Sequence, residues 1–354
     1  MTYNNMLNIA IMGFGTVGSG IVRVVSDSYS LIKRRLGDDI NIKRILDLRD
    51  FPDSPYSNRI THDFNEILND ESISVIAETM GGIGAAYKFT KALLESGKCV
   101  VSSNKELVAA HGAELLELAR AHGARYLFEG SVGGGIPLIR PMTESLAHDD
   151  ITEITAILNG TTNFILTEMA HSGASFADAL AEAQKLGYAE ADPTADVDGY
   201  DSCRKICILA AVAFGALLPF PEVKCTGIRS VTPADIAAAA ERNRAVKLIA
   251  RAKRLPDGKI EAEVAPFEVE MTNPLYAVEG VYNGVLLHGT MTGDVMFYGR
   301  GAGSLPTASA VVSDIVDCGC KIGNQPPQTF WSDGSGLYAR PDTASVEGLG
   351  NRLF

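Results

Sequence analysis

An acid and an amine four residues apart give the sequence its clearest chemical signal. Asp201 and Lys205 close a segment, residues 186–205, that contains five carboxylates together with Gly and Pro. On a helix, residues at this spacing project from the same face. Turned toward a cavity, such a pair could transfer a proton to or from a substrate. Turned toward solvent, it would be an ordinary surface ion pair, and spacing alone leaves both interpretations open.

A calcium-binding loop is a second alternative for the acidic segment. Asp196-Val-Asp198-Gly is similar to part of such a loop. The apolar neighbours Ala195 and Val197 and the absence of a glutamate at the required downstream spacing argue against it.

A glycine-rich turn near the start of the chain predicts a dinucleotide site. An apolar run at residues 7–12 is followed by Gly13-Phe14-Gly15-Thr16-Val17-Gly18 and then by an amphipathic stretch at residues 19–36. Gly13 permits a tight turn, Gly15 allows a pyrophosphate to approach the backbone, and Gly18 allows the helix to pack closely on the strand. The free N–H groups at the helix start favour an anion. We therefore expect these six residues to bind NAD or NADP.

The choice between the two cofactors stays open. The second apolar run ends with Asp47 and Arg49. An acid at this place favours NAD because it accepts hydrogen bonds from the ribose hydroxyls. An arginine favours NADP because it pairs with the 2′-phosphate.

The elements that must position these residues fall into two groups. Between residues 7 and 129, apolar runs alternate with helical patterns, which predicts an N-terminal Rossmann-type, doubly wound parallel sheet of the α/β class. After residue 150 the regular alternation of strands and helices ends, and the pattern becomes that of an α+β domain. There we expect strands at 151–158, 262–267, 285–289 and 295–298, with a hairpin joining the last two, and helices at 176–186 and 202–218. Residues 233–254 predict one long alanine-rich helix, with Thr232 as its N-cap and Pro233 at its first position.

Three parts follow from this pattern. We expect an NAD(P)-binding domain at 1–145, completed by a helix at 304–318 that packs back on it. A catalytic and dimerisation domain should span 146–303, with its apolar sheet needing cover from a second copy. Residues 319–354, rich in Pro, Gly, Ser and Asp, predict a peripheral tail without a core of its own.

Composition limits the classes of partner. The chain has 354 residues and a formal net charge of −12, which disfavours nucleic acid and anionic membrane surfaces. No apolar run reaches membrane-spanning length without Gly, Pro or charge. The six cysteines include no C-x-x-C pair, so reduced thiols and a cytoplasmic location are expected.

The acidic segment as a whole resembles the signature segment of homoserine dehydrogenases. It reads Leu186-Gly-Tyr188-Ala-Glu190-Ala-Asp192-Pro-Thr-Ala-Asp196-Val-Asp198-Gly-Tyr-Asp201-Ser-Cys-Arg-Lys205. Further family-like blocks occur in the right order between residues 7 and 318: the glycine turn, Ser103-Asn104-Lys105, Glu129-Gly-Ser-Val132-Gly-Gly-Gly-Ile136-Pro137, Asn159-Gly-Thr161-Thr-Asn163 and Tyr298-Gly-Arg-Gly-Ala-Gly303.

The resemblance implies an activity and a set of roles. The activity is the NAD(P)-dependent interconversion of L-homoserine and L-aspartate 4-semialdehyde, in the biosynthesis of threonine, methionine and isoleucine. By resemblance, the catalytic residues are Lys205, Asp201 and Lys105, and the substrate-binding residues are Glu190 and Asp196. The cofactor-binding residues are the six of the glycine turn with Arg49, Lys105 and Gly303. A sodium ion is implied at Glu129, Val132, Gly134 and Ile136, held largely by backbone carbonyls, and the family also implies a homodimer.

The chain departs from longer members of this family. It leaves no room for a C-terminal regulatory domain or a fused aspartokinase, so we expect a short form without cooperative inhibition by threonine. Two rival functions remain to be weighed. An aldehyde dehydrogenase that acylates a cysteine needs an activated Cys beside a His, and none of the six cysteines lies in such a block. A module that senses NAD(P) without turnover would need no proton donor such as Lys205.

Overall fold

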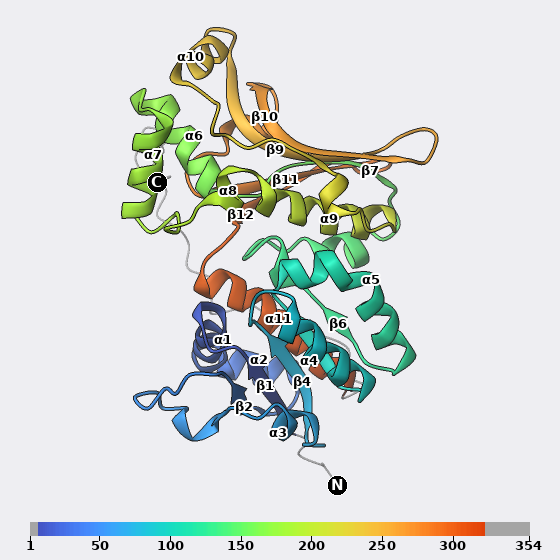
Figure 1. Ribbon diagram of the computed structural model, residues 1–354. Coiled ribbons are helices and arrows are strands. Elements are labelled where there is room, and N and C mark those ends of the chain that lie inside the picture. The colour runs from blue at the N-terminus through green and yellow to red at the C-terminus, as the bar shows by residue number, and fades with distance from the viewer. Residues whose placement is uncertain (1–5, 323–354) are drawn as a thin grey trace, which may run out of the picture.

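Two six-stranded sheets, each with its own helices, make up the molecule. The computed structural model describes residues 6–322. Figure 1 shows the first sheet and its helices below, the second sheet above, and α6, α8 and α9 between the second sheet and the first domain. Their bounds are α6 (Gly160–Ser172), α8 (Thr194–Val197) and α9 (Tyr200–Phe214).

The first sheet is parallel, in the order β3-β2-β1-β4-β5-β6. Its strands are β1 (Leu7–Met12), β2 (Ile40–Leu46), β3 (Ile60–Thr61), β4 (Ile73–Glu78), β5 (Cys99–Ser102) and β6 (Tyr126–Leu127). The central strands are buried on both faces, as expected for a sheet covered by helices on each side. The predicted doubly wound α/β fold is confirmed.

Helices cover both faces of this sheet. They are α1 (Thr16–Asp27), α2 (Tyr29–Leu36), α3 (Asn65–Leu68), α4 (Gly84–Glu95), α5 (Lys105–Ala121) and α11 (Ser304–Ile322). Residues of α1, α2 and α11 form one apolar cluster with β1 and β2, while α4 and α5 pack in another. The last helix of the described chain therefore lies against the first helix, as Figure 1 shows.

The second sheet has the order β12-β11-β7-β9-β10-β8. Its strands are β7 (Ile151–Ile157), β8 (Lys224–Cys225), β9 (Arg244–Arg254), β10 (Ile260–Glu270), β11 (Tyr282–Gly289) and β12 (Gly293–Arg300). Neighbours are antiparallel except for β8 and β10. The predicted hairpin is confirmed as β11 and β12. The remaining helices of this half are α7 (Phe176–Lys185) and α10 (Pro233–Glu241).

The prediction of one long helix over residues 233–254 is wrong. Helix α10 begins as predicted, with Thr232 capping it and Pro233 in the first turn, but it ends at Glu241. Asn243 has a positive φ of 56°, and the chain then continues as strand β9. Strand β9 hydrogen-bonds to β10 along its whole length and to β7 over residues 250–253. Pairing on both sides stabilises the extended form more than the modest helix propensity of alanine stabilises a helix.

Smaller differences concern element boundaries. The amphipathic stretch at 19–36 forms two helices that meet at Ser28 rather than one. Helix α6, which begins after Asn159, was not predicted, because its residues show no amphipathic period: both its faces are largely buried. Strands β3 and β6 contain two residues each.

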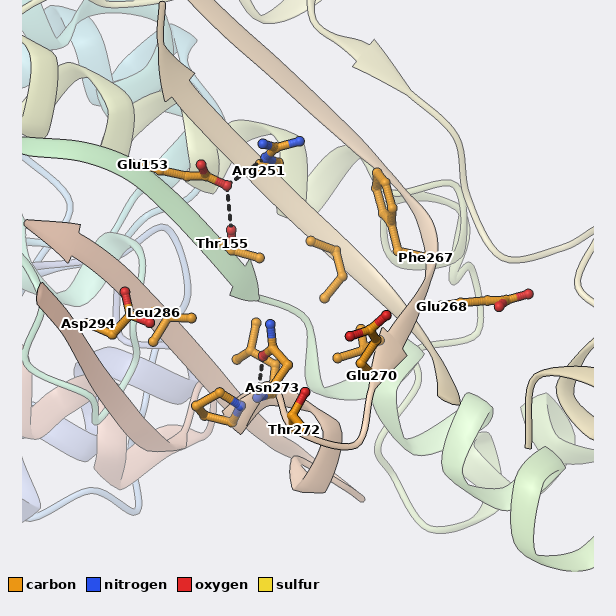
Figure 2. A pocket seen from close by; sticks show the side chains of 14 residues that line it. Glu153, Thr155, Arg251, Phe267, Glu268, Glu270, Thr272, Asn273, Leu286 and Asp294 are labelled. Atoms are coloured by element: carbon orange, nitrogen blue, oxygen red, sulfur yellow. Dashed lines mark hydrogen bonds and ion pairs between the residues drawn. The ribbon is translucent and has the colours of Figure 1, made fainter. Parts of the chain in front are cut away.

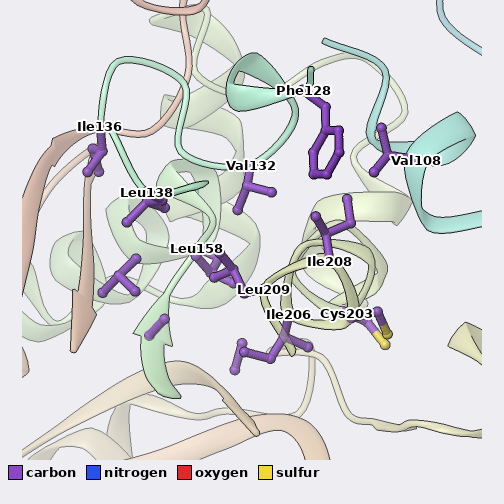
Figure 3. Packing of buried hydrophobic residues seen from close by; sticks show 14 of the residues in the cluster. Val108, Phe128, Val132, Ile136, Leu138, Leu158, Cys203, Ile206, Ile208 and Leu209 are labelled. Atoms are coloured by element: carbon purple, nitrogen blue, oxygen red, sulfur yellow. The ribbon is translucent and has the colours of Figure 1, made fainter. Parts of the chain in front are cut away.

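A shared apolar core holds the two halves together beside α9. Figure 3 shows Val108 of α5, Phe128 after β6, and Ile208 of α9 packed against one another. This packing fixes α5 and α9 relative to each other. No helix among residues 6–322 is long and apolar enough to cross a membrane. The helix predicted at 304–318 continues to Ile322, so residues 319–322 of the predicted tail belong to α11. The rest of the predicted tail, from position 323 onward, lies outside the described residues.

Candidate active site

Helix α9 presents the acid and the amine from its first two turns. The chain enters α9 through Gly199, whose φ of +86° is strained for other residues. Asp201 Oδ2 lies 2.8 Å from Lys205 Nζ, and both side chains are buried. Lys205 Nζ also donates to the Leu158 carbonyl at 2.9 Å. The pair is therefore an interior one, which rules out the surface ion pair.

A second lysine reaches the same carboxylate from the first domain. Lys105 is the first residue of α5, and Asn104 caps that helix by accepting a hydrogen bond from Leu107 N at 3.1 Å. The Lys105 ammonium forms an ion pair with Asp201 Oδ1. Asp201 thus joins one lysine from each half of the molecule.

Charge pairing shifts the pKa values of Asp201 and Lys105. Burial alone would raise the pKa of Asp201, but the charges of Lys205 and Lys105 hold it well below its usual range. Burial alone would lower the pKa of Lys105, but the Asp201 carboxylate raises it above its ordinary value. Asp201 is therefore a carboxylate and Lys105 an ammonium ion at neutral pH.

Asn159 links this trio to a third acid. Its Nδ2 donates to Asp201 Oδ2 at 2.9 Å and to Asp196 Oδ1 at 2.7 Å, while its Oδ1 accepts from Thr162 N and caps α6. Burial and the nearby Asp201 charge raise the pKa of Asp196. Asp198, the other acid of the calcium-like motif, pairs instead with Arg229, so the two carboxylates of that motif have different partners.

These side chains line a cavity of about 400 Å³. Glu190 lines it too, and within residues 6–322 its exposed carboxylate has no described hydrogen-bond or ion-pair partner. Three acids, Glu190, Asp196 and Asp201, and two lysines thus line one cavity. Its lining comprises Lys105, Asn159, Gly160, Thr161, Gly187, Tyr188, Ala189, Glu190, Asp196, Asp201, Lys205, Val281, Arg300, Ala302 and Gly303.

The glycine turn lies at the carboxyl end of β1, where a parallel sheet binds nucleotides. Gly13 has a φ of +96°, and a Cβ on Gly18 would lie 2.0 Å from the Gly13 carbonyl oxygen. A Cβ on Gly15, by contrast, would meet nothing within 4 Å, so the backbone there is open to a ligand. Ser304 at the start of α11 donates to Thr16 O at 2.7 Å, which ties the turn to the segment that follows the cavity-lining Gly303.

The end of β2 lies beside this turn. Asp47 Oδ2 accepts from Phe14 N at 2.7 Å, and both Asp47 oxygens accept from the Arg49 guanidinium at 3.0 Å. The Arg49 side chain lowers the pKa of Asp47 to about 2. Arg49 is 63% exposed and therefore remains accessible to a ligand. Phe14 packs edge-on against Phe51.

The loop proposed for a cation lies next to residues 300–303, part of which line the cavity. It contains Glu129, Val132, Gly134 and Ile136. Gly135 N donates to Arg300 O at 3.1 Å, and a Cβ on Gly134 would lie 2.5 Å from the backbone of Gly301. The Glu129 carboxylate accepts from the amides of Leu138, Ile139 and Arg140 at 2.5–2.9 Å. Three of its hydrogen-bonding positions are thereby taken, which leaves backbone carbonyls as the main oxygen ligands that this loop could offer a cation.

Larger cavities elsewhere lack such a set of groups. One of about 590 Å³ lies on the outer face of the second sheet, where Figure 2 shows Thr155, Phe267 and Leu286 beside Glu153 and Arg251. Glu153 and Arg251 are an ion pair at 2.8 Å. Another of about 520 Å³ lies between α1, α2 and α11. Neither combines buried lysines with a shared carboxylate.

The structure brings six of the predicted residues to one cavity: Lys105, Glu190, Asp196, Asp201, Lys205 and Gly303. The glycine turn and Arg49 follow the carboxyl ends of β1 and β2. The Glu129 loop is hydrogen-bonded to the backbone of Arg300. Asn159 is a site residue that sequence reasoning did not single out. The signal was its place at the start of the Asn159-Gly-Thr161 block, where Asn is a favoured helix N-cap.

Comparison with known proteins assigns this geometry to a family. The family described as "Homoserine dehydrogenase" matches residues 137–316, and "Homoserine dehydrogenase, NAD binding domain" matches residues 13–129. The homoserine dehydrogenase of Synechocystis sp. is 43% identical over 321 residues, covering 88% of this chain and 73% of that protein. That of Bacillus subtilis is 40% identical over 314 residues, covering 88% and 72%.

Solved structures agree. A homoserine dehydrogenase from Thiobacillus denitrificans superposes with a TM-score of 0.86 at 38% identity, covering 90% of this chain and 74% of that one. A hyperthermophilic archaeal homoserine dehydrogenase in complex with NADPH has a TM-score of 0.75 at 31% identity, covering 89% and 98%. The chain therefore belongs to the homoserine dehydrogenase family, the NAD(P)-dependent oxidoreductases that interconvert L-homoserine and L-aspartate 4-semialdehyde.

Proposed function

We propose that Lys205 is the proton donor and acceptor of the reaction, and that Asp201 and Lys105 hold it in place. The observation that carries this proposal is the single buried carboxylate shared by one lysine from each domain. The bound nicotinamide supplies the hydride in one direction and accepts it in the other. The protein's part is to orient the substrate and to move one proton at its C4 oxygen.

In the reducing direction, the Lys205 ammonium donates a proton to the aldehyde oxygen as the hydride reaches C4, which leaves a neutral alcohol and a neutral amine. In the oxidising direction, the neutral Lys205 amine takes the hydroxyl proton. Lys105 stays protonated, because the Asp201 carboxylate raises its pKa, and its charge stabilises the negative charge that develops on the substrate oxygen.

The acids of the cavity are suited to the other end of the substrate. We assign Glu190, with Asp196 behind it, to the α-ammonium group, because the Glu190 carboxylate is exposed to the cavity and not engaged by a described cation. The first turn of α6 also lines the cavity, at Gly160 and Thr161. Its amides favour an anion, so we assign the substrate carboxylate to this turn.

The adenosine end of the site favours NADP. Arg49 neutralises Asp47 and offers an exposed guanidinium to a 2′-phosphate, whereas the Asp47 oxygens are already occupied by Arg49 and by Phe14 N. The NADPH held by the archaeal relative is in line with this choice. The test is an NAD(P)H absorbance assay with aspartate semialdehyde and each reduced cofactor. A higher kcat/KM with NADH would contradict the assignment.

We assign a sodium ion to the loop of Glu129, Val132, Gly134 and Ile136. The observation in favour is that three backbone amides donate hydrogen bonds to the Glu129 carboxylate. The backbone carbonyls of the loop are then its main remaining oxygen ligands, and hard oxygen ligands are the kind that sodium prefers. When bound, the ion would brace the loop against Gly301. Thermal unfolding in sodium chloride against choline chloride tests this without the reaction, and equal midpoints would contradict it.

The outer face of the second sheet is assigned to a homodimer. Helices α6 and α9 cover the inner face, while the outer face carries apolar residues such as Ile249, Phe267 and Leu286 around a hollow of about 590 Å³. These side chains lie among the ion-paired Glu153 and Arg251, and such a mixture of apolar and polar groups suits an interface. We likewise assign cofactor binding to residues 1–145 with 304–318, and catalysis and dimerisation to 146–303. The net charge of −12 and the six free cysteines favour a cytoplasmic enzyme without a nucleic-acid partner.

A further inference from the structure

A fully buried carboxylate at the end of β4 takes no part in the proton transfer described above. Glu78 is the last residue of β4 and has no exposed surface. It stands at the carboxyl edge of the first sheet, in register with Ser102 at the end of β5. Its described hydrogen bonds among residues 6–322 are all with neutral groups. A buried carboxylate without a paired cation is unfavourable, so its presence asks for a physical reason.

Every described partner of this carboxylate is a donor. Oε1 accepts from Met80 N at 2.9 Å, and Oε2 accepts from the Ser102 hydroxyl at 2.6 Å. Burial raises the pKa of Glu78, and hydrogen bonds from Ser102 and Met80 act against that rise. A set of donors satisfies an ionised carboxylate, whereas the amide group of a glutamine would present its own donor to one of them.

The hydrogen bonds continue from Glu78 to the start of α5. The Ser102 hydroxyl that donates to Glu78 also accepts from Asn104 N at 3.0 Å. Asn104 caps α5 and also donates to Gly82 O at 2.6 Å. Glu78 therefore holds two segments at once: the loop after β4, through Met80, and the first turn of α5, through Ser102.

We propose that Glu78 is a positioning residue for Lys105: it fixes the start of α5 through Ser102 and so sets the Lys105 ammonium against Asp201. Lys105 is the first residue after the cap, so any shift of Asn104 moves it directly. A displacement of about 1 Å of a group at a reacting centre can cost on the order of 100-fold in rate. Glu78 itself touches neither substrate nor the reacting atoms.

The test compares three variants of the full chain. Glu78→Gln keeps the shape and removes the charge, and Ser102→Ala removes the hydroxyl that joins Glu78 to Asn104. Thr90→Val is the matched control, because this buried hydroxyl of α4 has no described hydrogen-bond partner. We expect Glu78→Gln and Ser102→Ala to lower kcat by roughly 10- to 100-fold, with the Kd for NADPH, read from its fluorescence, nearly unchanged. Thr90→Val should keep wild-type kcat.

A double-mutant cycle with Lys105→Met separates positioning from simple loss of structure. If Glu78 acts through Lys105, adding Glu78→Gln to Lys105→Met should lower kcat little further, because the group to be positioned is already gone. Fully additive losses would overturn the proposal, and so would a lowered melting temperature of Glu78→Gln with unchanged kcat. Ser102→Ala removes a single oxygen, so it keeps the proposal testable if Glu78→Gln fails to fold.

Discussion

Replacing Lys205 with alanine should remove nearly all turnover without unfolding the enzyme. The side chain provides the ammonium that reaches the substrate oxygen, and positioned general acid–base groups are worth about 10²- to 10⁴-fold in rate. That range corresponds to about 3–5.5 kcal/mol in the activation barrier. Lys105 is a poor replacement as a proton acceptor, because its pKa is raised by the Asp201 carboxylate, whose other oxygen it binds.

The structure also limits how far Lys205→Ala should destabilise the fold. Leaving a buried charge with no partner costs about 3–5 kcal/mol, but Asp201 would keep both the Lys105 ion pair and the Asn159 hydrogen bond. We therefore expect the free energy of unfolding to fall by less than about 3 kcal/mol. The loss of activity can then be assigned to chemistry.

The measurement is kcat in both directions by NAD(P)H absorbance, with the Kd for NADPH determined by fluorescence and the free energy of unfolding by urea titration. Arg204→Ala is the control: Arg204 is the preceding residue of α9, pairs with Glu106 at 3.7 Å, and lies outside the lysine–carboxylate trio. It should keep near wild-type kcat. A Lys205→Ala enzyme that retains more than about a tenth of wild-type kcat, a barrier change under ~1.4 kcal/mol, would refute the assigned role.

Three further outcomes are expected. Glu190→Gln should raise KM for homoserine about tenfold or more while kcat changes less, since it removes a charge that binds the substrate ammonium; a collapsed kcat with unchanged KM would mean a catalytic role. Asp201→Asn should lower the free energy of unfolding at pH 7 by about 3–5 kcal/mol. The pKa of Asp201 is lowered in the folded state. This stabilisation is therefore fully present above the pKa of the unfolded chain, about 3.9, and is lost as the pH falls toward the folded-state pKa. If urea titrations instead showed the stability difference between wild type and Asp201→Asn growing on acidification, the argument would be wrong. Sedimentation velocity at micromolar concentration should show a dimer for the wild type. Leu286→Asp on the outer sheet face should give a folded monomer that still unfolds cooperatively on heating. A monomeric wild type would reject the interface.

Local patterns predicted the first domain well because its signals are short-range. The apolar run, the glycine turn and the helix that follows are contiguous, and Gly18 is constrained by Gly13 within the same turn. The Asp201–Lys205 pair was readable for the same reason, since helical spacing alone places both on one face.

Features that depend on distant parts of the chain could not be read in this way. Strand β9 exists because β7 and β10 lie on either side of it, and nothing within residues 244–254 overrides the alanine-rich helical pattern. The ion pair of Lys105 with Asp201 joins residues 96 positions apart by their numbering. Asn159 was missed because its contacts with Asp196 and Asp201 arise only after α6 and α9 pack together.

The chain passes between its two sheets twice, once between Leu127 and Ile151 and once between Arg300 and Ser304. The apolar core beside α9 joins the halves as well, and it fixes α5 relative to α9. The Lys105–Asp201 ion pair spans the same boundary, so the packing that holds the halves together also keeps Lys105 against Asp201. Cohesion between the domains and the geometry of the proton-transfer site therefore depend on the same contacts.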